Sequence, residues 1–186
     1  PAWFVGTYPD RRVILTSYEA RFAASWGRKA RNLMEEYGQD CFGVQVADDS
    51  HAADAWAIQG RDGGMSTAGA GGPITGKGSD FLICDDPIKN YEEAKSETIR
   101  GNVWDWWQST AYTRLEPGAS VVVIQTRWHE DDLAGRLLAE AAGGGEQWEL
   151  INFPAVAEEY DALGRAPGDA LWPQRYDVES LTKIKQ

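Results

Sequence analysis

The chain has 186 residues, 42% of them apolar, and its 18 basic against 29 acidic side chains give a formal net charge of −11. This length fits one domain of ordinary size or a domain with an appendage, and nine Trp, seven Tyr and five Phe argue against disorder. No apolar run approaches the ~18 residues of a membrane span, and the negative balance argues against a surface that binds nucleic acid everywhere, while leaving room for a local basic patch.

The first third of the chain contains predicted strands around one helix. Residues 12–16 (RVILT) form a β-branched apolar run, which predicts a buried strand. Ser17 is expected to cap the next helix, whose apolar residues recur at three- and four-residue steps until Gly38 ends it. Short strands are predicted at residues 41–46, 55–59 and 65–68, with Asp62-Gly63-Gly64 as the hairpin turn between the last two.

The rest of the chain continues the alternation. A glycine-rich loop at residues 69–79 precedes a second buried strand at residues 81–84. Further on, the sequence predicts helices at 92–112 and 131–142, strands at 120–125 and 148–152, and a last short helix capped by Asp177. Apolar strands that alternate with helices are typical of a parallel sheet covered by helices. In such sheets, functional residues gather at the carboxyl ends of the strands.

Two adjacent acids, Asp85 and Asp86, follow the strand at residues 81–84 directly. Neighbouring carboxylates repel each other in a low-dielectric setting, so their pairing suggests a compensating charge. A nucleotide-bound Mg²⁺ would supply it, with Asp85 reaching the metal and Asp86 orienting or deprotonating an attacking water. The alternative is that two acids simply end a strand and begin a turn at Pro87.

A second set of polar residues, Gln125, Thr126 and Arg127, stands at the end of the strand at residues 120–125. In a parallel sheet this strand would lie close to that of Asp85, so these residues could sense a phosphate and relay its loss. The alternative for Arg127 is a surface salt bridge to Glu130 or Asp131. His129 and the acids after it suggest a metal cluster on paper, but acids in a first helical turn are the simpler interpretation.

The segment from Gly71 to Gly78 (GGPITGKG) nearly matches a phosphate-binding loop. Its eighth position is Gly78 where Ser or Thr is needed, and a predicted strand follows it where a helix is needed. We therefore interpret the segment as a loop that carries one basic residue, Lys77.

Taken in order, several segments resemble the ATPase domain of the large terminase subunit of tailed bacteriophages and prophages: RVILTSYEARFA, TGKGSDFLICDDPIKNYEEAKS, WDWW, VVVIQTRWHEDDLAGRLL, INFPAV and ALWPQRY. The resemblance implies an α/β fold of the P-loop NTPase type (the ASCE class), with a mostly parallel sheet flanked by helices and incomplete at the N-terminus. It assigns residues 1–153 to a partial ATPase core and residues 154–186 to a turn-rich extension that begins a linker to a nuclease domain.

The resemblance also implies roles for individual residues. Asp85 matches the Walker B aspartate that holds Mg²⁺, and Asp86 stands at the position of the catalytic carboxylate. Gln125, Thr126 and Arg127 match the motif that couples hydrolysis to movement. Lys77 lies where many relatives place a basic residue, often Arg, that reaches the ATP of a neighbouring subunit; Lys lacks the planar guanidinium fork of Arg.

As a function, the resemblance implies ATP hydrolysis with Mg²⁺ that drives double-stranded DNA into a procapsid. The expected partners are the DNA, the terminase small subunit, the portal protein of the procapsid, and further copies of the chain in a ring, with no membrane. The expected location is the cytoplasm of the infected or lysogenic bacterial host, in agreement with Cys41 and Cys84 as the sole cysteines and with no signal-peptide pattern.

The family's P-loop is expected upstream of the strand at residues 12–16, and its nuclease domain after Gln186. We therefore expect this chain to be inactive by itself as an ATPase. Without the P-loop strand, the strands at residues 12–16, 81–84 and 120–125 should be contiguous and leave an apolar sheet edge, which predicts marginal stability or self-association.

Two other classes of function are compatible with the sequence. Asp85, Asp86 and a distant acid such as Asp132 could bind two metals in a nuclease or phosphohydrolase. The chain could also be a non-catalytic prophage remnant. A helicase with the same core is a near neighbour, and the residues after the coupling strand favour a terminase by resemblance alone.

Overall fold

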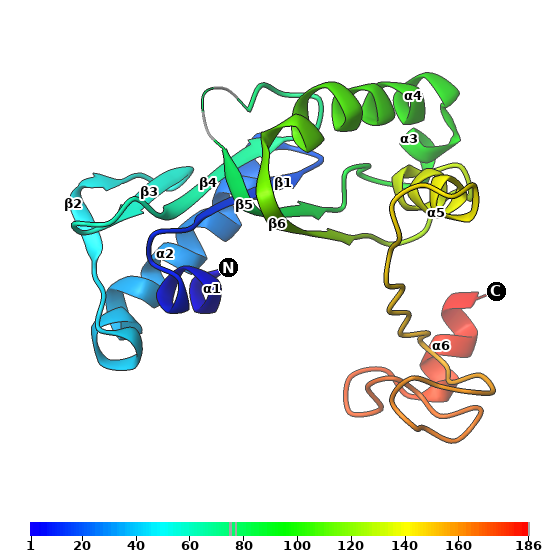
Figure 1. The fold of residues 1–186 in the computed structure, drawn as a ribbon. Helices are drawn as coiled ribbons and strands as arrows, with labels where there is room; N and C mark the ends of the chain where they lie inside the picture. Colours follow the sequence, from blue (N-terminus) through cyan, green and yellow to red (C-terminus); the bar gives the residue numbers. More distant parts are fainter. Residues whose placement is uncertain (75, 77, 186) are drawn as a thin grey trace. The chain divides into compact units, whose positions relative to one another are not determined.

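The computed structural model describes residues 1–74, 76 and 78–185, and it divides the chain into two compact units, Pro1–Gly143 and Gly144–Gln186 (Figure 1). The first unit holds a six-stranded sheet in the order β2-β3-β4-β1-β5-β6. Strands β4, β1, β5 and β6 are mutually parallel, whereas β3 runs antiparallel to both of its neighbours, β2 and β4. The α/β class with a mostly parallel sheet is therefore confirmed.

Strand β1 (Arg12–Ser17) lies in the middle of the sheet, between β4 (Gly64–Gly69) and β5 (Ser79–Asp85). Every residue of β1 after Arg12 is buried, because a central parallel strand is covered on both faces. Strand β6 (Leu115–Ile124) pairs with β5 on the far side. The predicted contiguity of the strands at residues 12–16, 81–84 and 120–125 is thus confirmed.

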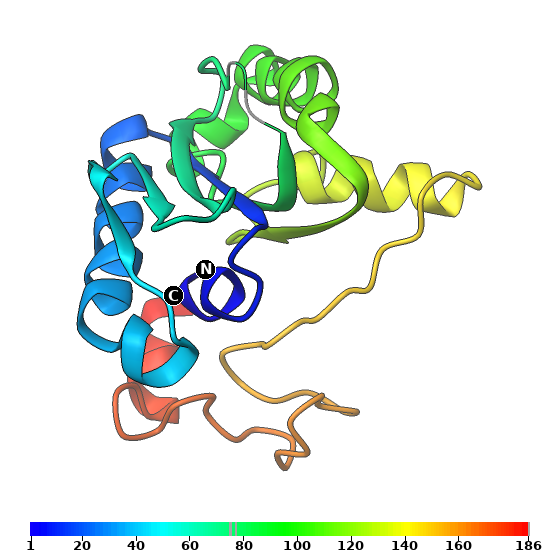
Figure 2. The same cartoon turned by 60° about the vertical axis from the view of Figure 1, so that its left-hand side comes forward.

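Helices cover the two faces of this sheet separately (Figures 1 and 2). Helices α1 (Ala2–Thr7) and α2 (Ala20–Phe42) pack on one face, where Val13 and Leu15 join Val5 and Ala23 in the core. Ile14 alternates with those strand residues and therefore faces the opposite side. The chain from α3 to α5 covers that side (Figure 2).

The helix predicted between Ser17 and Gly38 is α2, and both of its predicted ends were wrong. Ser17 does not cap it: Ser17 is the buried last residue of β1, and α2 begins after Glu19. Gly38 lies inside the helix, where a Cβ would stand 2.8 Å from the carbonyl oxygen of Val44, so a close backbone approach needs the glycine there. The helix ends at Gly43, which adopts a φ of 70°.

The extra length of α2 also displaces the first strand of the meander. Residues 41 and 42 belong to the helix, and the strand predicted at 41–46 is replaced by β2 (Val46–His51). The other two predicted strands are confirmed as β3 (Ala55–Ile58) and β4. They form an antiparallel pair joined through the predicted turn, in which Ile58 N–H donates to the Gly63 carbonyl.

The helical stretch predicted at residues 92–112 is broken at Ser96. Helix α3 (Tyr91–Lys95) is capped by Asn90, and α4 (Glu97–Trp106) is capped by Ser96, whose hydroxyl accepts from Ile99 N–H. The stretch then continues as a π-helical turn (Trp107–Ala111) and a 3-10 turn (Tyr112–Arg114). After β6, helix α5 (Leu133–Ala142) begins at Asp132, whose carboxylate accepts from Gly135 N–H.

The second unit carries little regular structure. The strand predicted at residues 148–152 is absent: these residues form no sheet pairing, and Leu150 and Ile151 are exposed. An apolar run forms a strand when a neighbouring strand satisfies its backbone, and among the described residues no strand lies paired with this run. Helix α6 (Val178–Lys185) begins, as predicted, at Asp177, whose carboxylate accepts from Ser180 N–H.

Across the described residues, no helix has both the length and the apolar character that crossing a membrane requires.

Candidate active site

The carboxyl ends of three neighbouring parallel strands meet at one edge of the sheet. Ser17 of β1 is in register with Asp85 of β5, and Asp85 is in register with Ile124 of β6. Gln125 and Thr126 follow Ile124 directly. The fold therefore brings together the two polar segments that the sequence predicted to be neighbours, one from each strand end.

Asp86 is fixed on three sides by hydrogen bonds. Its backbone N–H donates to the carbonyl of Ile124 at 2.8 Å, and its own carbonyl accepts from Tyr18 N–H at 2.9 Å. Its carboxylate Oδ1 accepts from Thr126 N–H at 3.0 Å. The backbone of Asp86 also adopts a φ of 42°, a left-handed conformation that costs a residue with a side chain on the order of 1 kcal/mol. Such strain at a sheet's carboxyl edge is a feature of functional positions.

Asp85 has a different environment from its neighbour. Its side chain is half-buried, and within the described part of the chain its carboxylate accepts no hydrogen bond. Burial, and to a lesser extent the charge of Asp86, raise the pKa of Asp85 above its ordinary value. Because burial and the neighbouring charge disfavour the ionised form of this carboxylate, a bound cation would stabilise it.

The donor set around Asp85 and Asp86 fits Mg²⁺ bound with a phosphate compound. Mg²⁺ commonly takes one or two carboxylates and completes its shell with waters and phosphate oxygens. Among the residues that the structure describes, no group of three or more His, Cys, Asp or Glu side chains could hold a metal ion. The pair therefore suits a metal that arrives with its own ligands better than it suits an all-protein cage.

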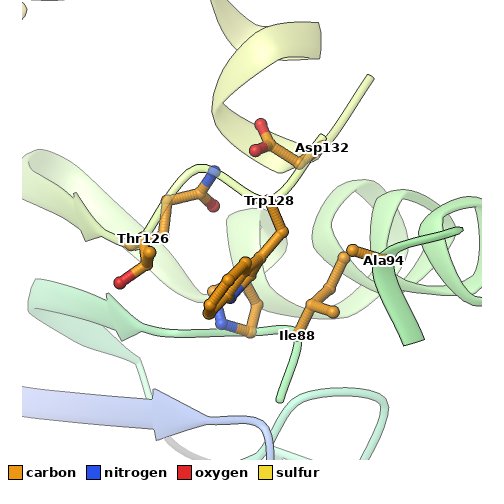
Figure 3. A pocket seen from close by; sticks show the side chains of 7 residues that line it. Ile88, Ala94, Thr126, Trp128 and Asp132 are labelled. Atoms are coloured by element: carbon orange, nitrogen blue, oxygen red, sulfur yellow. The ribbon is translucent and has the colours of Figure 1, made fainter. Parts of the chain in front are cut away.

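A small depression with a cavity volume of about 10 Å³, partly open to solvent, lies next to this pair. In Figure 3 the apolar side chains of Ile88, Ala94 and Trp128 lie around it, together with Thr126 and Asp132. Gln125 also lines it, and the amide nitrogen Nε2 of Gln125 is buried without a hydrogen-bond partner among the described residues. A buried amide without a partner is costly, and it marks Gln125 as a group available to a ligand or to a changed conformation.

Arg127 is engaged at a different acid from those the sequence suggested. Its Nε donates to the carboxylate of Asp132 at 2.7 Å, and its NH2 group donates to the Glu130 carbonyl at 3.2 Å. The salt-bridge interpretation of Arg127 is therefore correct in kind but wrong in partner. The guanidinium bonds Asp132 and neither acid of the Asp85–Asp86 pair.

The engagement of Asp132 also weighs against the two-metal interpretation. Its carboxylate is almost fully buried, holds Arg127 and caps α5 through Gly135 N–H. His129 accepts from Asp131 N–H through Nδ1, which is a helix-start contact. Both side chains thus have structural partners at the start of α5.

An ion-pair network behind the site was not foreseen from the sequence. The carboxylate of Asp131 accepts two hydrogen bonds from Arg136, at 2.8 and 2.9 Å, and one from Arg100 at 3.1 Å. Arg100 is 9% exposed and also donates to the Ala94 carbonyl at 2.7 Å. The bonds from Arg136 and Arg100 hold the pKa of Asp131 far below its ordinary range. The network ties α4 to the loop between β6 and α5.

Two other sites need separate mention. Ser17, expected to be a helix cap, is in register with Asp85, and its fully buried hydroxyl has no hydrogen-bond partner in the part of the chain that the structure describes. No local signal distinguishes such a serine from a cap. Lys77 lies outside the described residues. Beyond it, strand β5 follows the glycine-rich segment, as the interpretation of that segment as a loop requires.

Comparison with known proteins agrees with this geometry. A family model described as the N-terminal part of the terminase large subunit, T4likevirus-type, matches residues 1–186. A search of curated proteins found no match. Because the family model covers the whole chain, the chain belongs to the T4-like terminase large-subunit N-terminal family, whose role is the packaging of phage DNA.

Proposed function

We propose that this chain carries the hydrolytic and coupling residues of an ATP-driven motor that moves double-stranded DNA into a procapsid. The observation that carries the proposal is the hydrogen bond from Thr126 N–H to the Asp86 carboxylate, which ties a candidate catalytic acid to the segment proposed to couple hydrolysis to movement. Members of this family are generally ATPases, so the chain's membership in the family supports ATP hydrolysis as the reaction class.

In this proposal the two acids have separate roles. The half-buried Asp85 carboxylate holds Mg²⁺, directly or through its water shell, and the raised pKa of Asp85 fits a site that needs a cation. When bound, Mg²⁺ neutralises charge on the β- and γ-phosphates. Asp86 keeps its Oδ1 on Thr126 N–H, and its second oxygen orients or deprotonates the attacking water.

The coupling segment is proposed to respond to the state of Asp86. A shift of the Asp86 carboxylate pulls on Thr126, and Gln125 has an amide nitrogen free to bond a phosphate or a rearranged neighbour. Arg127 would transmit the change to α5, because Asp132 both holds its guanidinium and caps that helix. Lys77 is proposed to reach the ATP of an adjacent subunit.

The proposed cofactors are therefore ATP and Mg²⁺. The proposed partners are double-stranded DNA, the terminase small subunit, the portal protein of the procapsid and further copies in a ring, within the cytoplasm of the bacterial host.

The test is Mg²⁺-dependent ATP hydrolysis by the product of the complete reading frame that encodes this chain. Asp86→Asn should lower turnover at least about 100-fold, as expected for loss of a general base, while Mg²⁺–ATP binding is retained. Asp49→Asn, which removes an exposed acid on β2, is the matched control and should leave turnover unchanged. Retained turnover in Asp86→Asn would remove that residue from the mechanism, and absence of nucleotide binding in the parent would favour a non-catalytic remnant.

A further inference from the structure

A row of aromatic rings with a cation at each end begins at the candidate active site and runs along α2. Tyr18 stacks on Phe22 with ring centroids 5.2 Å apart, and Phe22 meets Trp26 edge-on at 6.1 Å. Lys89 Nζ lies 5.9 Å from the Tyr18 ring centre, and Lys29 Nζ lies 4.0 Å from the Trp26 ring centre. We call this set, Lys89–Tyr18–Phe22–Trp26–Lys29, the aromatic row.

The aromatic row faces away from the core of its unit. Helix α2 buries the opposite side, which is made of small residues such as Ala23, Gly27 and Ala30. Phe22 is 37% exposed and Trp26 is 38% exposed. Large aromatic surfaces left in water in a connected group are typical of binding surfaces, because burial of such rings inside the unit would have stabilised the fold.

Most charges around the aromatic row are positive in a chain that is negative overall, and the exposed Glu19, directly after Tyr18, is the acid at its start. Between Ala20 and Asn32 the helix carries four cations and no acid, although the chain has a net charge of −11. Arg21 and Arg28 are exposed and seven residues apart, so they lie on the same side of the helix beside the row. In the described part of the chain, the side chains of Arg21, Arg28, Lys29 and Lys89 form no ion pair.

The second half of α2 provides an internal comparison. It also exposes an aromatic ring, that of Tyr37, which is 47% exposed. Its neighbours Glu35, Glu36 and Asp40 are acidic, and they would repel a polyanion. The positive charge is therefore confined to the half of the helix that carries the aromatic row.

Cations interleaved with exposed rings match a single nucleic-acid strand. Lysine and arginine bind its phosphates, and its unstacked bases offer flat faces to aromatic rings. A duplex offers phosphates but hides its base faces, so the rings would gain nothing from it. We propose that the aromatic row of α2 binds single-stranded DNA. The choice of DNA rests on the family's role in DNA packaging, and the binding itself requires no ATP hydrolysis.

The row is also connected to the candidate active site through the backbone. Tyr18 N–H donates to the carbonyl of Asp86 at 2.9 Å, and Lys89 follows Asp86 by three residues. A DNA strand bound on the row would thus contact Tyr18, which is hydrogen-bonded to Asp86, and Lys89, which follows Asp86 along the chain.

The experiment measures fluorescence anisotropy of a labelled oligo(dT) of about 20 nucleotides with the 186-residue chain, without nucleotide or Mg²⁺. We expect binding that is at least about ten-fold tighter than binding to a duplex of the same length. The logarithm of the affinity should fall as the logarithm of the salt concentration rises, with a slope of about 3. This value assumes that Arg21, Arg28, Lys29 and Lys89 each bind one phosphate and contribute ~0.7.

The variants separate stacking from charge. Trp26→Ala should weaken binding about five-fold or more, whereas Trp26→Phe keeps a ring and should stay within about two-fold. Arg21→Glu with Arg28→Glu should lower the salt slope by about 1 to 2. Tyr37→Ala, the matched control on the acidic half, should bind like the parent, and circular dichroism of each variant checks its fold.

Three outcomes would overturn the proposal: equal affinity for the duplex, unchanged binding by Trp26→Ala, or no binding to the oligonucleotide. The second would assign the surface to charge alone, and the third would leave it to a protein partner. Since none of these measurements uses ATP, failure here is distinguishable from failure of the proposed ATPase activity.

Discussion

The carboxylate of Asp86 accepts a hydrogen bond from the backbone N–H of Thr126 at 3.0 Å, across 40 residues of sequence. Asp86 is held at its backbone as well, by the Ile124 carbonyl on one side and by Tyr18 N–H on the other. One residue therefore links the ends of β1, β5 and β6. A change at its carboxylate reaches the loop that leads into α5 without any intermediate side chain.

The first prediction concerns how three substitutions of Asp86 differ. Asp86→Asn keeps an oxygen for Thr126 N–H and tolerates the left-handed backbone, so the melting temperature should change by less than about 2 °C. Asp86→Ala loses the bond and lacks the polar side chain that helps Asp and Asn adopt the left-handed conformation, which should cost about 1–2 kcal/mol, or about 3–6 °C. Thermal unfolding by circular dichroism measures both.

Asp86→Gly is the control for the backbone contribution. Glycine also loses the side-chain bond but adopts a φ of 42° without strain, so its melting temperature should lie between those of the other two variants. Equal melting temperatures for the alanine and glycine variants would mean that relief of the left-handed strain is no larger than the additional chain entropy that glycine loses on folding.

The second prediction concerns the charge of Asp85. Burial and the Asp86 charge raise the pKa of Asp85 in the folded state above the unfolded value of about 3.9. The folded chain is therefore favoured while Asp85 is protonated, and this advantage is lost as the pH rises through the folded pKa. Asp85→Asn should raise the melting temperature by about 1–2 °C at pH 7, a small gain because the carboxylate is half-exposed.

The pH dependence of that gain is the decisive measurement. With a chelator present, the gain should shrink to nothing as the pH is lowered to about 3, where the acid is protonated in both states. A gain that is the same at both pH values would mean that it comes from packing or hydrogen bonding of the amide and not from removal of charge.

The third prediction tests the network around Asp131. Asp131→Asn removes the negative charge paired with the buried guanidinium of Arg100 and leaves one carbonyl oxygen where two carboxylate oxygens served Arg100 and Arg136. The expected loss is about 1–2 kcal/mol, less than for a fully buried pair because Asp131 is 42% exposed. This corresponds to about 3–6 °C in the melting temperature.

The sign of the pH effect at Asp131 is opposite to that at Asp85. Arg136 and Arg100 lower the pKa of Asp131, so its contribution is present above the unfolded pKa of about 3.9 and is lost as the pH falls toward the folded value. The difference between parent and Asp131→Asn should therefore narrow between about pH 4 and pH 2. Asp49→Asn should show no such difference at any pH, and a parent–variant gap that is as large at pH 2 as at pH 4 would contradict the ionic origin.

The sequence predicts the strands of the sheet well because β1 and β5 are inner strands and each contains an unbroken apolar run, Val13–Leu15 and Phe81–Cys84. It fails at residues 148–152, where an equally apolar run has no neighbouring strand among the described residues. Periodicity reports a preference for burial, whereas a strand also needs a hydrogen-bonding partner, and the partner is not encoded locally. The end of α2 was misplaced for a related reason: Gly38 is required by the Val44 carbonyl, a tertiary contact.

The candidate site also has a part that the sequence predicts and a part that it does not. The placement of Asp85, Asp86, Gln125 and Thr126 at one sheet edge follows from the rule for parallel strands. The partner of Arg127 does not, because several acids follow it and three-dimensional geometry selects Asp132. Arg100 and Asp131 are 31 residues apart, and no spacing rule connects them.

The last prediction concerns the open edge of the sheet. Strand β6 lies at one edge of the sheet, with β2 at the other, and on β6 Val122 is 40% exposed and Ile124 is 51% exposed. An exposed edge with β-branched apolar residues pairs readily with other chains, whereas inward or outward lysines on such an edge prevent pairing. Val122→Lys with Ile124→Lys should shift the chain from associated species toward monomer in analytical ultracentrifugation.

Leu33→Lys, which changes an exposed apolar residue of α2 in the same way, is the control and should leave the association unchanged. If the parent chain sediments as a monomer at concentrations where its melting transition is sharp, the edge is not a self-association surface. If Leu33→Lys suppresses association as strongly as the β6 variants do, association depends on net charge and not on the edge of β6.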